Sequence, residues 1–191
     1  MTTYTVGYFV GSLSTKSLNR LLARALIKLA PHELDLHEIT YGDLPLFNRD
    51  FEGRYPPRAT ALKESIARVD ALLFVTPEYN RSIPGALKNA IDWASRPKEE
   101  NSFTGKPSAV TGASTGSIGT AIAQQHLRSL LAYCKSPQLS NEAYIQVTPG
   151  LITAEGEITN DSTREFLGTW MQDFCRFIAD HYAARPVTFD L

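Results

Sequence analysis

Short apolar runs alternate along the chain with segments whose apolar residues recur every three or four positions. Runs at 6–10, 71–75 and 108–111 have the length of strands, and each precedes a segment with helical spacing. The run at 71–75 is apolar throughout, which predicts a central strand covered on both faces. Residues 34–39 alternate with polar side chains and predict an edge strand.

The segments with helical spacing complete an alternating pattern of strands and helices. Apolar stripes predict helices at 18–29, 61–69, 87–94, 122–131 and 166–178. A fifth strand is expected within 136–147, whereas 41–57 has no periodicity and predicts a long exposed loop. Five strand–helix units predict one α/β domain over residues 1–191, built as an open doubly wound parallel sheet with helices on both faces.

Composition and charge narrow the class of protein. Hydrophobic residues make up 43% of the chain and charged residues 20%, as in ordinary globular proteins. A net charge of −1 favours neither nucleic acid nor an anionic membrane as a partner. No apolar stretch approaches the ~20 residues of a membrane span, and the N-terminus lacks a signal segment, so we expect a cytoplasmic protein. Neither the two cysteines nor the four histidines have metal-ligand spacing, so no metal site is expected.

Ligands of doubly wound sheets bind at the carboxyl ends of the strands, which draws attention to three loops. The first, residues 11–19, combines four hydroxyl side chains with Lys16 and Asn19. Hydroxyls and free N–H groups at a helix start predict a phosphate site. Ordinary helix capping by Ser14 or Ser17 is the simpler interpretation.

The second and third loops have different chemistry. The second, 76–85, is stiffened by Pro77 and Pro84. A rigid backbone can hold main-chain N–H and C=O groups along the rim of a planar polar ring. An exposed turn is the simpler interpretation. The third, 111–119, offers hydroxyls and three glycines where a backbone can approach a ligand closely.

Two named phosphate motifs are absent from the first strand and its loop. A Walker A loop needs Gly before the Lys-Ser pair, but Thr15 precedes Lys16 and Ser17. The dinucleotide fingerprint fails because Gly7 and Gly11 lie four positions apart. A P-loop NTPase and an NAD-type Rossmann domain are therefore disfavoured.

A hydrolase is an alternative, because the third loop contains G-x-S-x-G with Ser114 at its centre. Asp161 or Asp173 followed by His181 would complete the hydrolase chain order. Against this, Asp173 and His181 fall two turns apart on one predicted helix, and the chain is short for an α/β-hydrolase.

The first two loops carry a family resemblance. Gly11-Ser12-Leu13 with Ser17 and Asn19, followed by TPEYN at 76–80 and IPGALKNAIDW at 83–93, resembles the NADPH-dependent FMN reductase family, in particular its chromate/quinone reductase members. The resemblance covers about residues 4–180. It implies a flavodoxin-like sheet in the order 2-1-3-4-5, non-covalent FMN, and a homodimer or homotetramer.

The resemblance also implies an activity. Hydride would pass from NADPH or NADH through FMN to quinones, flavins or similar small acceptors, with chromate and azo compounds as further candidates. The flavin carries this chemistry, so no side chain is named as catalytic. A flavodoxin-type electron carrier without its own NAD(P)H reaction is the alternative, but such carriers are usually strongly acidic.

Site residues follow from the same resemblance. The phosphate would be held by Ser12, Ser14, Ser17, Leu18 and Asn19, the isoalloxazine lined by Pro77, Glu78, Tyr79 and Asn80, and the third side closed by Ser114, Thr115 and Gly116. Ser14 stands where relatives often have Arg, which should weaken phosphate binding unless Lys16 or Arg20 compensates. Arg81 is either a solvated side chain or a contact for an anionic substrate.

Overall fold

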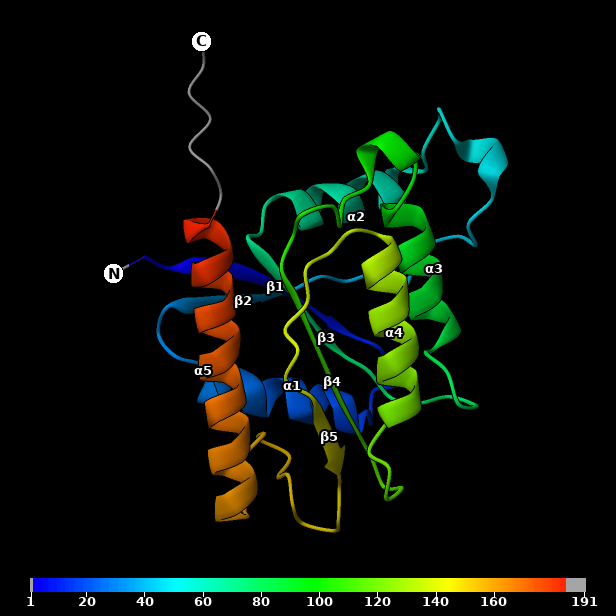
Figure 1. The fold of residues 1–191 in the computed structure, drawn as a ribbon. Helices are drawn as coiled ribbons and strands as arrows, with labels where there is room; N and C mark the ends of the chain where they lie inside the picture. The colour runs from blue at the N-terminus through cyan, green and yellow to red at the C-terminus, as the bar shows by residue number, and fades with distance from the viewer. Residues whose placement is uncertain (1, 185–191) are drawn as a thin grey trace.

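A five-stranded sheet lies between two layers of helices in the computed structural model, which describes residues 2–184 (Figure 1). The strands are β1 (Tyr4–Val10), β2 (Leu34–Glu38), β3 (Ala71–Val75), β4 (Ser108–Ser114) and β5 (Ala143–Gln146). Every pairing is parallel and the order is β2-β1-β3-β4-β5. The predicted doubly wound, flavodoxin-like fold is confirmed.

Helices cover both faces of this sheet (Figure 1). They are α1 (Leu18–Leu29), α2 (Pro57–Ala67), α3 (Gly85–Ala94), α4 (Ala121–Tyr133) and α5 (Asp161–Ala183), with short 3-10 helices at Arg49–Phe51 and Lys98–Glu100. The core under α1 and α5 is separate from the core under α2, α3 and α4. None of the helices within residues 2–184 is long and apolar enough to cross a membrane.

Strand β3 shows why its sequence is apolar at every position. Ala71, Leu73 and Val75 point into the core beneath α1 and α5, whereas Leu72 and Phe74 point into the opposite core. All five residues are buried. A strand with helices on both faces has no solvent side, so alternation disappears. Strand β2, at the sheet edge, keeps exposed positions as predicted.

Strand β4 is longer than the apolar run predicted. It continues to Ser114 because Thr111–Ser114 pair with β5 through Ala143–Gln146. Residues 112–114, which the sequence assigned to a loop, are therefore strand residues. The third loop starts at Thr115.

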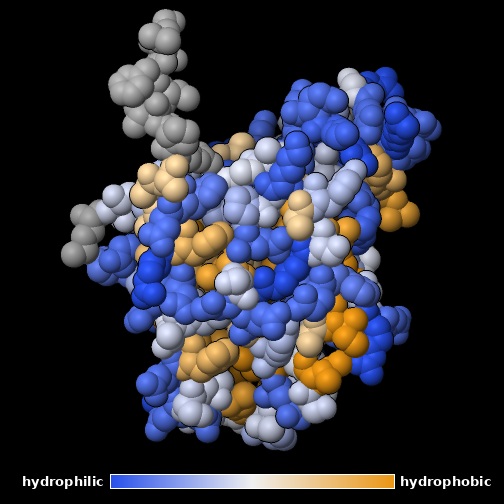
Figure 2. All heavy atoms as spheres, viewed as in Figure 1, coloured by the Kyte–Doolittle hydropathy of each residue, from blue (hydrophilic) through white to orange (hydrophobic). Residues whose placement is uncertain are grey.

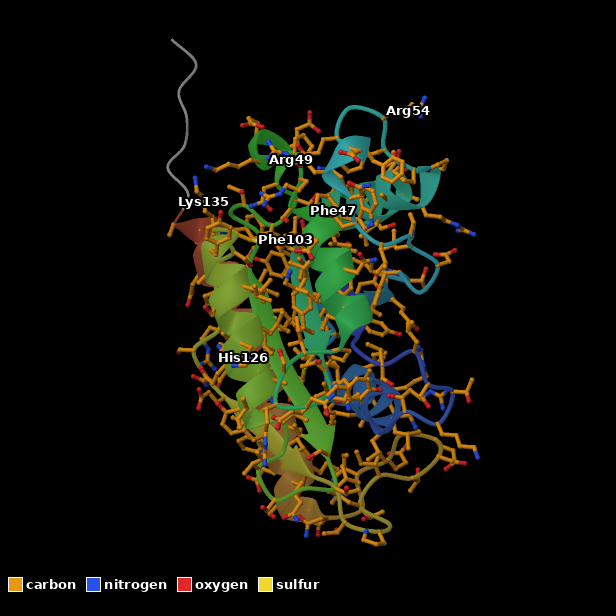
Figure 3. The ribbon with its side chains drawn as sticks, turned by 90° about the vertical axis from the view of Figure 1, so that its right-hand side faces the viewer. Phe47, Arg49, Arg54, Phe103, His126 and Lys135 are labelled. Atoms are coloured by element: carbon orange, nitrogen blue, oxygen red, sulfur yellow. The ribbon has the colours of Figure 1, made fainter. Side chains whose placement is uncertain are left out.

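The segment between β2 and α2 is held against α3 (Figure 3). The Asn89 side chain accepts a hydrogen bond from Phe47 N at 2.8 Å and donates to Pro45 O at 3.0 Å. The indole N–H of Trp93 donates to the same carbonyl at 2.7 Å. The expectation of a long exposed loop is thus only partly right: the segment has no period, but α3 fixes its path.

Candidate functional site

Three loops leave the same edge of the sheet, at the carboxyl ends of the adjacent strands β1, β3 and β4 (lower part of Figure 1). Gly11 N donates to Val75 O at 2.8 Å, and Thr76 N donates to Thr111 O at 2.9 Å. These two bonds continue the ladder one step past the ends of β1 and β3. They hold the start of each loop beside the next strand.

The first loop presents main-chain N–H groups without partners. Within residues 2–184, no protein acceptor meets the N–H of Ser12, Leu13, Thr15, Leu18 or Asn19. The last two belong to the first turn of α1, where no helical carbonyl is in reach. Neither this loop nor the first turn of α1 contains an acidic side chain. The positive end of the helix is therefore open to an anion.

The serines of the first loop shape it from inside. Ser12 and Ser17 are buried, and Ser12 Oγ accepts a bond from Ser14 N at 3.3 Å. Ser14 Oγ accepts from Lys16 N at 3.3 Å, and Ser17 Oγ caps α1 through Arg20 N at 3.2 Å. Capping by Ser17 is thus real, and it leaves the N–H groups of Ser12, Leu13, Thr15, Leu18 and Asn19 without a partner within residues 2–184.

Arg20 does not supply the positive charge missing at Ser14. Its guanidinium Nη1 donates to both Glu38 carboxylate oxygens, at 3.0 and 2.9 Å. This hydrogen bonding with Glu38 raises the pKa of Arg20. Lys16, which is exposed, is the remaining cation of the first loop.

Asn19 uses its whole amide inside the protein. Its Nδ2 donates to Ala113 O and its Oδ1 accepts from Ala113 N, both at 2.9 Å. The side chain is 2% exposed. Asn19 therefore fastens the start of α1 to β4, and what it can offer a ligand is its main-chain N–H.

The second loop contains a tight turn. Tyr79 and Ser82 exchange both main-chain hydrogen bonds, at 2.9 and 3.0 Å, and Asn80 and Arg81 between them have φ angles of 52° and 64°. Two left-handed residues in this position are typical of a type I′ turn. Ser82 Oγ lies 3.2 Å from Nδ1 of His126, which projects from the middle of α4 (Figure 3).

The Glu78 carboxylate reaches α4. Its Oε2 accepts hydrogen bonds from Ile122 N at 3.1 Å and Ala123 N at 3.2 Å, and its Oε1 lies 3.2 Å from Arg81 Nη1. Sequence reasoning missed this bond. The one hint in the sequence is that the first turn of α4 has no acidic residue of its own, so its N–H groups need an acceptor from elsewhere.

Two glycines let the strand ends come close to Thr76. A Cβ added at Gly11 would lie 2.7 Å from Thr76 Oγ1, and one added at Gly112 would lie 2.0 Å from Thr76 O. A real Cβ cannot approach backbone so closely, so only glycine fits at Gly112.

Tyr41 also holds the site edge; it lies in the loop that the sequence predicts, but it is buried, not exposed. Its buried hydroxyl donates to Val10 O, at the end of β1, at 2.7 Å. Burial raises the pKa of this phenol.

Each loop exposes one large apolar side chain: Leu13, Tyr79 and Ile118 are 55%, 49% and 41% exposed. The Tyr79 hydroxyl also lies 3.3 Å from Ser12 Oγ, which joins the first two loops. At the end of β4, Ser114 Oγ accepts from Gly116 N at 3.2 Å, while Thr115 and Gly116 of the third loop are exposed.

The hydrolase interpretation is wrong. His181 contacts Gly105 O at 3.0 Å, just before β4 begins, whereas Ser114 is the last residue of that strand. Seven strand residues span roughly 20 Å, so the two side chains cannot form a nucleophile–base pair. The Asp173 carboxylate binds Asn141 and Arg176 instead.

The part of the chain that the structure describes contains no candidate metal site. No three or more His, Cys, Asp or Glu residues there come together as a candidate metal site. Cys134 and Cys175 are both free thiols.

The donor set fits FMN. Unpaired N–H groups at the start of α1 suit a phosphate dianion. The main-chain N–H groups of Glu78 and Asn80 have no partner within residues 2–184, which leaves donors beside the exposed Tyr79 ring for a planar polar heterocycle.

Comparison with known proteins agrees with this fit. The model of the family described as NADPH-dependent FMN reductase matches residues 4–148. A 2-hydroxy-1,4-benzoquinone reductase from a Burkholderia species is 45% identical over 176 residues, which cover 92% of this chain and 96% of the relative. A quinone reductase from Pseudomonas putida is 45% identical over 177 residues, covering 92% and 95%.

A solved structure is similarly close. FerB, a flavoenzyme NAD(P)H:(acceptor) oxidoreductase from Paracoccus denitrificans, superposes with a TM-score of 0.90 at 44% identity, covering 94% of this chain and 99% of FerB. With the family model matched over most of the length and relatives above 40% identity, the chain belongs to the NADPH-dependent FMN reductase family.

Proposed function

We propose that this protein is an FMN-dependent NAD(P)H oxidoreductase that reduces quinones. The observation that carries the proposal is the row of unpaired N–H groups at the acid-free start of α1, beside a proline-stiffened loop at the same sheet edge. Family membership supplies FMN and NAD(P)H as the cofactors that fit this edge.

The phosphate of FMN would be held by the first loop. The N–H groups of Ser12, Leu13, Thr15, Leu18 and Asn19 and the exposed Ser14 hydroxyl are its donors, with Lys16 as the cation. Charge-assisted hydrogen bonds from several main-chain donors are each stronger than neutral ones. Lys16 would take the place of the arginine that is missing at Ser14, because Arg20 is bound to Glu38.

The ring would rest against the other two loops. Pro77 and Tyr79 offer faces, Glu78 and Asn80 offer main-chain N–H donors, and Ser114, Thr115 and Gly116 form the third side. When held there by these residues, FMN would supply the two-electron redox chemistry between NAD(P)H and an acceptor. The protein would hold the ring with one face open, so that the nicotinamide and the acceptor reach that face in a reactive orientation.

Quinones are the acceptor class that the relatives favour, since two of them are named quinone or hydroxybenzoquinone reductase. Flavins, chromate and azo compounds are secondary candidates. A carrier that lacks an NAD(P)H reaction is disfavoured by the near-zero net charge of −1.

Steady-state NADPH oxidation with 1,4-benzoquinone tests the function. We expect turnover that needs both protein and FMN and exceeds the rate with the same FMN free in solution. A rate no greater than that of free FMN would contradict the reductase function. Repeating the assay with NADH gives the nucleotide preference.

We also propose a homodimer or homotetramer located in the cytoplasm. The proposal rests on the resemblance to the family, because single exposed apolar side chains such as Leu46 and Tyr133, 83% and 73% exposed, are ordinary on a protein surface. On the face seen in Figure 2, hydrophobic residues form small groups separated by hydrophilic surface. Sedimentation velocity of the FMN-loaded protein measures the assembly directly, and a monomer would contradict it.

A further inference from the structure

We propose that Glu78 is a positioning residue of the flavin site, which acts by capping α4 and not by touching the cofactor with its carboxylate. The inference rests on the proposed function of this edge of the sheet. Its evidence is a set of contacts that join the second loop to a helix more than 40 residues further along the chain.

Helix α4 lacks a cap of its own. Thr120 precedes it with φ 71° and makes no side-chain capping bond, and no acidic residue lies in the first turn. Without Glu78, the N–H groups of Ile122 and Ala123 would have no acceptor. Glu78 Oε2 fills both places at 3.1 and 3.2 Å. A carboxylate at this position also faces the positive end of the helix dipole.

The same bonds fix the loop that carries Glu78. The side chain is only 10% exposed, and its second oxygen lies 3.2 Å from Arg81 Nη1 across the turn. Both carboxylate oxygens are therefore engaged. These bonds fix the backbone around Glu78 relative to α4. The unpaired N–H groups of Glu78 and Asn80 are fixed in the same way.

Two helices thus start at this edge, and only one of their positive N-terminal ends has a negative partner. The N-terminus of α1 has no acidic partner, whereas that of α4 is neutralised by Glu78. A phosphate dianion is accordingly directed to α1, and the ring is left to the loop between them. A donor set held in place before binding loses less entropy when the ligand arrives.

Three variants test the assignment. Glu78→Ala removes the cap, and Glu78→Gln keeps one acceptor oxygen but removes the charge. Asn160→Ala is the matched control, because Asn160 caps α5 through Thr163 N at 2.9 Å without contacting the second loop. The readouts are the melting temperature of the apoprotein, the FMN dissociation constant by fluorescence quenching, and the visible spectrum at saturating FMN.

We expect Glu78→Ala and Asn160→Ala to lower the melting temperature by similar amounts, about 2–4 °C for a chain of this size. Only Glu78→Ala should weaken FMN, by about tenfold or about 1.4 kcal/mol. At saturation its bound flavin should also show an altered absorption envelope, whereas Asn160→Ala should match the unmodified protein. Glu78→Gln should fall between the two in FMN affinity.

An FMN dissociation constant unchanged in Glu78→Ala would overturn the assignment, and so would equal weakening in Asn160→Ala. Failure of the proposed function looks different, because the unmodified protein itself would then bind no FMN.

Discussion

Single buried polar residues set the spacing of the loops at the site edge. Asn19 is the clearest case, since its amide satisfies both main-chain groups of Ala113. Ala113 lies next to the end of β4, and its own side chain is packed in the core under α1. One amide thus fixes the start of α1, and with it the first loop, against the end of β4.

Asn19→Ala should therefore destabilise the protein and weaken its binding of FMN. Two buried main-chain groups would lose their partner, each at about 1–3 kcal/mol. Urea unfolding of the apoprotein measures the loss, which we expect to be about 2–4 kcal/mol. A loss well under 1 kcal/mol would mean that water replaces the amide, and the tether would then be unimportant.

The buried phenol of Tyr41 should make stability fall at alkaline pH. Its pKa is raised by burial above the ordinary 10.0, so above that pH the unfolded chain loses a proton that folded Tyr41 keeps. The stabilisation is complete below pH 10 and is lost as the pH rises further.

Tyr41→Phe isolates that contribution. At neutral pH the variant should lose about 1 kcal/mol with the bond to Val10 O. Between about pH 8 and pH 11 it should lose less stability than the unmodified protein, as measured by urea unfolding. Parallel curves for the two proteins would show that Tyr41 does not contribute to the alkaline loss.

Residue types in the first loop predict an anion site, but they do not predict the partners of its residues. Hydroxyls and an ammonium after a strand indicate an anion site whatever surrounds them. The partner of Asn19 lies 94 positions away and that of Glu78 lies 44 positions away. Such pairs depend on how β4 and α4 pack, which no local pattern encodes.

At the scale of elements, the spacing of β1, β3 and β4 depends on glycine. Thr76 is fully buried between Gly11 and Gly112, and its main chain occupies the place of a Cβ at Gly112. The strands can diverge into three loops only beyond this contact.

Gly112→Ala should consequently disrupt the site. The added carbon would lie 2.0 Å from Thr76 O and 2.5 Å from Thr120 Oγ1, so β3 and β4 must separate. We expect a loss of about 3 kcal/mol or more in unfolding free energy, together with loss of FMN binding.

Gly85→Ala is the control for this change, because a Cβ there has no atom within 4 Å. It should leave stability within about 1 kcal/mol and FMN affinity unchanged. Equal stability of the two variants would contradict the packing argument.

The bounds of a strand could be predicted where burial alone determines them, but not where they depend on pairing with another strand. The run at Ala71–Val75 is buried on both faces, so its apolar pattern is sufficient. Strand β4 extends through Gly112 because β5 pairs with it, although glycine and serine there are typical of loops. The path of the segment after β2 depends on Asn89 and Trp93 of α3, about 45 positions away.

At the scale of the whole molecule, the parts of the fold that stabilise it are separate from the loops that form the candidate site. Two apolar cores on opposite faces stabilise the fold, and the loops at one edge carry the polar groups. Two acidic side chains near that edge already have partners: Glu38 pairs with Arg20, and Glu78 accepts hydrogen bonds from the start of α4. The edge is therefore receptive to an anionic cofactor, although the chain as a whole is slightly acidic.

A paired titration of the apoprotein with FMN and with riboflavin tests this account most directly, because the two differ only by the phosphate. FMN should bind with quenched fluorescence, and riboflavin should bind at least about 100-fold more weakly, since charge-assisted bonds to the first loop are lost. Equal affinities, or no binding of FMN, would contradict a phosphate site at the start of α1.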